Sequence, residues 1–265
     1  MSDWLLNLPV LWMGVVILGF IYLGTAGIYL LITKLAVGER LKAFKGITPA
    51  ILPPLSVVFG LLVAFLASQV WGEADKASAA VNREASSLRA VVLLAARFPG
   101  DTQTHINRLV HDYIDEAVKK EWPAMAQHNA TLAIAPPTLA EALQLALTLN
   151  PHRPGEIDAQ QEMVAALQNA LDARRQRIVL SGSSINWVKW TVLLIQAGLT
   201  LLTVAMVHCD NPPANRIILT IFASGVGVAV WLIAANTRPF AGEISVKPNL
   251  LLQVMPEAGP NGAGP

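Results

Sequence analysis

The sequence feature that most limits the fold is an uncharged stretch, Ile51 to Trp71, that leads without a break into a polar helix-forming segment. As an α-helix with a rise of about 1.5 Å per residue, this stretch can cross a hydrocarbon layer of about 30 Å. Residues 72–88 are rich in helix formers, and their single glycine, Gly72, costs only about 1 kcal/mol in a helix. We therefore predict one long helix that begins in a membrane and continues into water.

The composition and the other apolar runs extend this prediction to the whole chain. Hydrophobic residues make up 54% of the sequence and charged residues 14%, against about a quarter charged in an average soluble protein. Polar helix-forming sequence with few alternating runs separates the apolar runs, so a sheet is not expected. The sequence predicts an all-α membrane protein with transmembrane helices at 10–33, 51–71, 188–207 and 217–235, a helical soluble domain at 72–186 inserted between the second and third, and an extended tail at 236–265.

Local signals subdivide these regions. Residues 34–48 are expected to form a short loop, and Pro53 and Pro54 to kink or restart the second membrane helix. Within the soluble domain, Phe98-Pro-Gly-Asp101 is a chain break, with Asp101 or Thr102 expected as the N-cap of a helix over 102–120. The residues predicted for the apolar side of that helix are Ile106, Leu109, Val110, Tyr113, Ile114 and Val118.

The second membrane helix carries a stripe of small residues, Gly60, Ala64 and Ser68, at positions i, i+4 and i+8. Two interpretations remain open. The stripe can be a seam for helix packing, or it can face the axis of an oligomer and line a pore. In the second interpretation Phe59, Val63 or Phe65 would narrow the pore, and a hydrophobic constriction can gate ions by dewetting.

Two acidic residues, Glu73 and Asp75, follow the second apolar run. In an oligomer they would form acidic rings at the pore mouth, and such rings favour cations. The alternative is a solvated helix face.

A tail motif follows the fourth apolar run. Arg238 and Pro239 are expected to end the helix, Phe240 to return to the membrane interface, and Gly242 to let the backbone turn before Glu243.

Several functional classes are disfavoured. A net charge of +1 gives no nucleic-acid-binding signature, and the single cysteine and scattered histidines match no metal site. The apolar runs contain no charged residue, which disfavours ion-coupled transport. No nucleotide-binding, catalytic or zinc motif is present, so neither a cofactor nor enzymatic activity is expected.

Three passages together resemble one known family. They are Phe59 to Trp71 followed by Val81-Asn-Arg-Glu-Ala85, then Glu121-Trp-Pro-Ala-Met125, and finally Arg238 to Pro248. They are similar to a bacterial four-pass membrane family of unknown function that is labelled bestrophin-like. The resemblance implies an inner-membrane location, contact with membrane lipid, and distant kinship with pentameric anion channels lined by their second membrane helix.

Two functions follow as hypotheses. In the first, the chain forms a homo-oligomeric ion channel or pore lined by the second membrane helix, with an inorganic ion as its ligand. In the second, it is a non-conducting membrane sensor or scaffold whose helical domain binds a partner. The two differ in whether the face of Gly60, Ala64 and Ser68 meets water or another helix.

Overall fold

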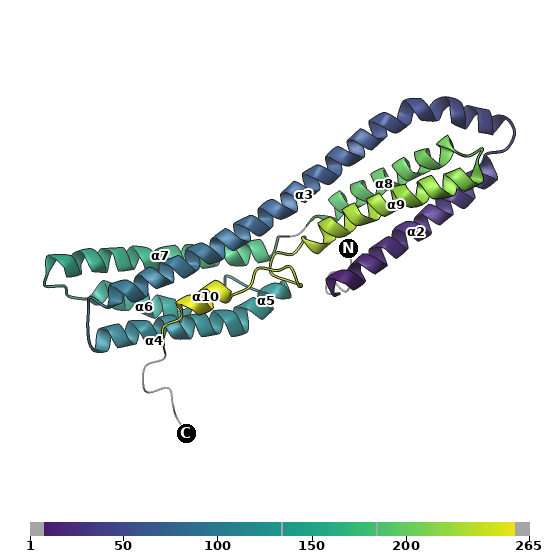
Figure 1. Ribbon diagram of the computed structural model, residues 1–265. Coiled ribbons are helices and arrows are strands. Elements are labelled where there is room, and N and C mark those ends of the chain that lie inside the picture. Colours follow the sequence, from purple (N-terminus) through teal and green to yellow (C-terminus); the bar gives the residue numbers. More distant parts are fainter. Residues whose placement is uncertain (1–7, 134, 184, 258–265) are drawn as a thin grey trace, which may run out of the picture. The chain divides into compact units, whose positions relative to one another are not determined.

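The computed structural model describes residues 8–133, 135–183 and 185–257, and every regular element in these ranges is a helix (Figure 1). The chain divides into two compact units. The first comprises the described parts of 1–72, 184–237 and 242–244, and the second those of 73–183, 238–241 and 245–265. Helix α3 (Glu39–Ala95) contributes to both.

The first unit contains α2 (Val10–Leu35), the first part of α3, α8 (Trp187–Val207) and α9 (Pro212–Ala235). Four helical segments are long and apolar enough to span a membrane: α2, α3 from Ala50 onward, α8 and α9. The four apolar runs predicted from the sequence lie within them. The prediction of an all-α membrane protein is confirmed, whereas the insertion of a soluble domain between the second and third spans stays a prediction.

The first connection differs from the expected loop over 34–48. Helix α2 ends at Leu35 and α3 already begins at Glu39, so the connection is limited to residues 36–38, with Gly38 at φ 62°. Pro53 and Pro54 lie inside α3, which continues through them and curves over this part (Figure 1). Proline removes a backbone donor and clashes with the preceding turn, so a helix that continues through a proline pair bends.

Helices α2 and α9 lie side by side in the first unit (Figure 1). At one contact Gly14 leaves room for Trp231, whose indole Nε1 donates a hydrogen bond of 3.0 Å to the Val10 carbonyl. At another, Gly227 leaves room for the side chain of Leu18. One apolar cluster, contributed by α2, α3, α8 and α9, includes Met13, Ile17, Phe59, Leu66, Val70, Trp190, Leu193, Val226 and Val230.

The second unit contains residues 73–95 of α3, α4 (Asp101–Glu116), the π-helix η1 (Ala117–Glu121), α5 (Trp122–Ala126), α6 (Pro137–Thr148), α7 (Pro154–Ser181) and α10 (Asn249–Val254). Helix α4 packs against α6, and α6 packs against α7. The predicted helix over 102–120 corresponds to α4 and η1. Its apolar side is confirmed, because its first five predicted residues are buried and Val118 is half-buried against the same core.

The expected N-cap of this helix is wrong. Asp101 is its first helical residue and Gly100 occupies the cap position with φ 96° and ψ −142°. This positive φ turns the chain into the helix, and glycine adopts it without a steric penalty.

The N-terminus of helix α7 is capped by a side chain. Glu156 accepts hydrogen bonds from the backbone N–H groups of His152 (2.9 Å) and Arg153 (3.3 Å), and these bonds lower the pKa of its carboxyl group.

Candidate functional site

The five predicted pore-lining residues fall on two different sides of α3. Phe59 is buried in the apolar cluster of the first unit, and Val63 is half-buried against it. Gly60, Ala64 and Ser68 are exposed, and among the described residues no atom beyond the adjoining part of α3 lies within 4 Å of the position that a Gly60 Cβ would take.

The helical period explains this division. Phe59, Leu66 and Val70 repeat at seven- and four-residue spacings, which places them on one face of α3. That face packs against the other three helices of the unit. The exposed face includes Gly60, Ala64 and Ser68, which we call the α3 stripe. Phe59 does not lie on this exposed face, because its side chain is only 9% exposed within its own chain.

The two mouth candidates have different environments. Glu73 is half-buried and accepts a hydrogen bond of 3.3 Å from the Ser183 hydroxyl, whereas Asp75 is exposed. A polar contact that the sequence did not indicate lies one turn before Glu73, where Lys189 donates to the Gln69 side chain at 2.7 Å. The role of Asp75 in an acidic ring stays a prediction.

Residues 238–241 of the tail motif belong to the second unit. Phe240 is only 4% exposed and meets the Trp122 ring edge-on, with centroids 5.8 Å apart. Trp122 Nε1 donates to the Val246 carbonyl (3.2 Å), and the Val246 N–H donates to the Pro239 carbonyl (2.8 Å). The Trp122 ring gives Phe240 a buried apolar contact, and the expected return of this residue to the membrane interface stays a prediction.

The rest of the motif agrees with its expected local role. Helix α9 ends at Ala235, before Arg238 and Pro239. Gly242 has φ 85°, a value that glycine adopts without strain, and Glu243 is exposed.

The largest polar feature of the second unit is a buried ion-pair network that sequence reasoning missed. The Arg177 guanidinium donates through Nε (2.7 Å) and a terminal nitrogen (3.0 Å) to the two carboxylate oxygens of Glu84, and both side chains are fully buried. Arg177 also contacts Glu121 at 2.8 Å, and Arg174 contacts the other oxygen of Glu121 at 2.6 Å. The network therefore links α3, η1 and α7.

Two arginines and two glutamates give this network a net charge of zero. Burial would lower the pKa of Arg177, but the adjacent Glu84 carboxylate raises it, and the outcome is a pKa above the ordinary value. The Tyr113 hydroxyl donates to Glu84, and burial followed by the Glu84 charge raises the pKa of Tyr113 well above its usual value of about 10. The Arg177 guanidinium also lies 4.8 Å from the Trp122 ring centroid.

The sequence did contain a signal for this network. Glu84 continues the apolar face formed by Ala77, Val81, Leu88 and Val91, so a charge stood within a helical apolar pattern. A buried carboxylate needs a cationic partner. Which arginine pairs with Glu84 could not be predicted from the sequence, because Arg177 lies on α7, which is distant along the chain.

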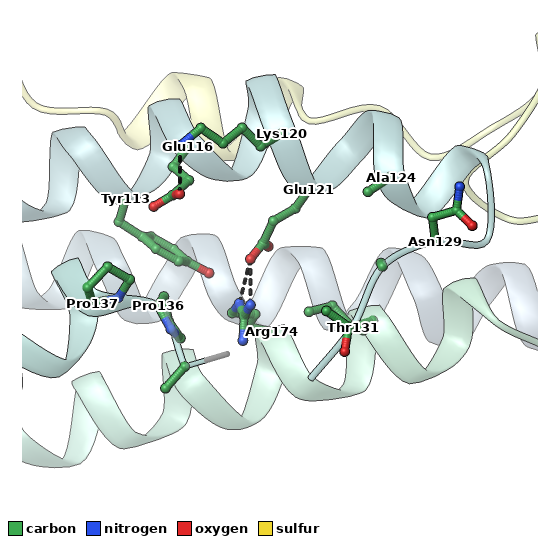
Figure 2. Close-up of a pocket in the computed structure, with 13 residues that line it drawn as sticks. Tyr113, Glu116, Lys120, Glu121, Ala124, Asn129, Thr131, Pro136, Pro137 and Arg174 are labelled. Atoms are coloured by element: carbon green, nitrogen blue, oxygen red, sulfur yellow. Dashed lines mark hydrogen bonds and ion pairs between the residues drawn. The ribbon is translucent and has the colours of Figure 1, made fainter. Parts of the chain in front are cut away.

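A cleft of about 220 Å³ lies beside the network (Figure 2). Arg174 and Glu121 face it with their ion pair, and Glu116 and Lys120 pair across 3.0 Å at its edge. Asn129, Thr131, Pro136 and Pro137 line the remaining wall. The charged groups of the cleft pair with one another, which suits a structural junction or a small polar ligand better than acid–base catalysis. Within the described residues, no group of three or more His, Cys, Asp or Glu side chains is arranged to hold a metal ion.

Comparisons with known proteins agree with this architecture. The family model described as "Bestrophin-like domain" matches residues 19–251, which include every passage on which the resemblance was based. A crystal structure of a mutant bacterial bestrophin homologue from Klebsiella pneumoniae has a TM-score of 0.67 and 12% identity, and the match covers 89% of this chain and 96% of that one. A mutant described as a membrane protein matches with a TM-score of 0.66, 14% identity and the same coverage. No curated protein matches the chain.

Proposed function

Because this chain belongs to the Bestrophin-like family, we propose that it forms a homo-oligomeric ion channel of the bacterial inner membrane with α3 lining the ion path. The observation that carries the proposal is the exposure of the α3 stripe. The opposite face of α3 is buried against the three other helices of its unit, so in the single chain the stripe lies on the side that can contact water, lipid or a second copy.

The chemistry of the stripe suits a path for ions. Glycine, alanine and serine are small and uncharged, and the Ser68 hydroxyl can replace part of an ion's hydration shell. Leu61 and Phe65 lie next to the stripe and are each 66% exposed, which makes them candidates for a constriction that gates by dewetting. The resemblance implies anions, whereas rings of Asp75 would favour cations, so the sign of the reversal potential decides the selectivity.

The test is ionic current from the purified full chain in planar bilayers under a KCl gradient. We would place a cysteine at Ser68 in a Cys209→Ala background and apply a charged thiosulfonate reagent. Modification at a pore-lining position adds a charge to the path, and we expect it to change the current.

The matched control is Leu23→Cys on α2, an exposed position (72%) on a different membrane helix. Its modification should leave the current unchanged. Equal effects at both positions would contradict the assignment of the path to the α3 stripe.

A second candidate function is a non-conducting sensor or scaffold, and the cleft beside Arg174 and Glu121 favours it. Absence of current from folded, oligomeric protein over a range of voltage and pH would contradict the channel. The search would then move to ligands and partners of the second unit.

A further inference from the structure

A second cleft, of about 230 Å³, lies between α2 and α9 within the first unit. Its walls include Tyr22, Thr25, Ala26 and Tyr29 from α2, and Arg216 and Thr220 from α9. The predicted pore path does not use it, because none of these residues belongs to α3.

Arg216 gives this cleft its charge. Its guanidinium lies 5.9 Å from the centroid of the Tyr29 ring, as in a cation–π contact. Across the described ranges, no carboxylate lies within ion-pair distance of Arg216. A guanidinium on a membrane helix is costly unless it meets water or an anion, and its planar donors match phosphate oxygens.

The position of the cleft along the helices matches the headgroup level of a bilayer. Arg216 is in the second turn of α9, which begins at Pro212, and Tyr29 lies less than two turns before the end of α2 at Leu35. At about 1.5 Å per residue both lie within about 10 Å of the helix ends, where tyrosine and arginine are commonly found in membrane proteins.

The rest of the cleft is apolar or internally satisfied. Ile217 and Ile221, which follow the lining residues Arg216 and Thr220 in the sequence of α9, are 62% and 67% exposed. The Thr25 hydroxyl donates to the Ile21 carbonyl, and the Tyr22 and Ser224 hydroxyls pair at 2.7 Å. A ligand for this site therefore needs one anionic group near Arg216 and an apolar remainder.

We propose that this cleft binds an anionic phospholipid, with Arg216 contacting the headgroup phosphate and an acyl chain lying along Ala26 and Ile221. Basic residues near these helix ends support this choice. Lys34 in the last turn of α2 and Arg40 and Lys42 in the first turns of α3 are exposed. Anionic lipid is attracted to such basic helix ends. The site does not depend on whether the protein conducts ions.

The test is native mass spectrometry of the full chain in detergent, titrated with phosphatidylglycerol or with phosphatidylcholine of the same acyl chains. We expect phosphatidylglycerol to bind more tightly, and Arg216→Gln to bind it about tenfold more weakly, because a charge-assisted phosphate contact is lost. Arg89→Gln, which removes an exposed charge of the second unit, should retain the wild-type affinity.

Two more variants separate the contact from general effects of charge and folding. Ala26→Trp fills the cleft without changing the charge and should also weaken binding, and Arg216→Lys should restore only part of the affinity, because lysine lacks the planar donor pair. Melting temperatures of all variants report on folding. If Ala26→Trp does not fold, the phosphatidylglycerol affinities of Arg216→Gln and Arg216→Lys test the proposal.

Three outcomes would overturn the proposal. They are equal phosphatidylglycerol affinity in the wild type and Arg216→Gln, equal affinity for the two lipids, and displacement of the lipid by millimolar inorganic phosphate. The last result would assign the site to a free anion instead of a lipid.

Discussion

Arg177 on α7 and Glu84 on α3 form a two-point ion pair, at 2.7 and 3.0 Å, with both side chains fully buried. The pair fixes α7 against the part of α3 that belongs to the second unit. Attraction between buried charges is strong, but so is the cost of removing them from water. Loss of one partner therefore lowers the free energy of unfolding by much more than the intact pair adds to it.

We therefore expect Arg177→Met to lower the free energy of unfolding by about 3–5 kcal/mol, because Glu84 is left buried without its bidentate partner. Denaturant unfolding in detergent measures this change. Arg175→Met, on the exposed side of the same helix, is the control and should stay close to wild type. Adding Glu84→Gln to Arg177→Met should recover part of the loss, and no recovery would contradict the assigned cause.

Tyr113→Phe tests the raised pKa of Tyr113. At pH 7 we expect a loss of about 1 kcal/mol from the missing hydrogen bond to Glu84. Unfolded Tyr113 loses its proton near pH 10, whereas the folded state retains it to higher pH. Above pH 10 the folded state holds more protons, so wild-type stability falls with pH.

The stability difference between wild type and Tyr113→Phe should therefore shrink above pH 10. Unfolding measured for both proteins from pH 7 to 11 checks this expectation. Both proteins contain Tyr22 and Tyr29, so the stability difference between them reports on Tyr113. A difference that stays constant or widens would contradict the raised pKa.

Phe240→Ala should destabilise the protein by about 3 kcal/mol, because a large side chain that packs edge-on against Trp122 is replaced by a cavity. Ile244→Ala, at a nearby position that is 59% exposed, should have little effect. Thermal unfolding in detergent compares the two. If Phe240 instead lay at the membrane interface, the two variants would behave alike.

Gly14→Ala should destabilise the packing of α2 against α9. An added Cβ would lie 2.8 Å from the Trp231 ring, which must then shift and weaken its hydrogen bond to Val10. Gly19→Ala is the matched control on the same helix, because nothing lies within 4 Å of its Cβ position. Since alanine is favoured over glycine within helices by up to about 1 kcal/mol, that variant should be neutral or more stable. Equal melting temperatures for the two variants would refute the close contact.

Features that depend only on neighbouring residues could be predicted from the sequence. Uncharged runs of membrane length specify four apolar helices, and the Pro- and Gly-containing break at 98–101 separates α3 from α4. The buried side of α4 also followed from its periodicity, because the repeat of 3.6 residues is a property of the helix itself.

The tertiary structure decided which groups meet across long sequence separations. It brought Arg177 to Glu84, Phe240 to Trp122, and Arg216 to Tyr29, and it separated Phe59 from the α3 stripe. Each of these contacts depends on how two helices are placed and rotated against each other. Local sequence fixes the apolar side of a helix, but the partner that a buried charge or ring finds there is set by packing.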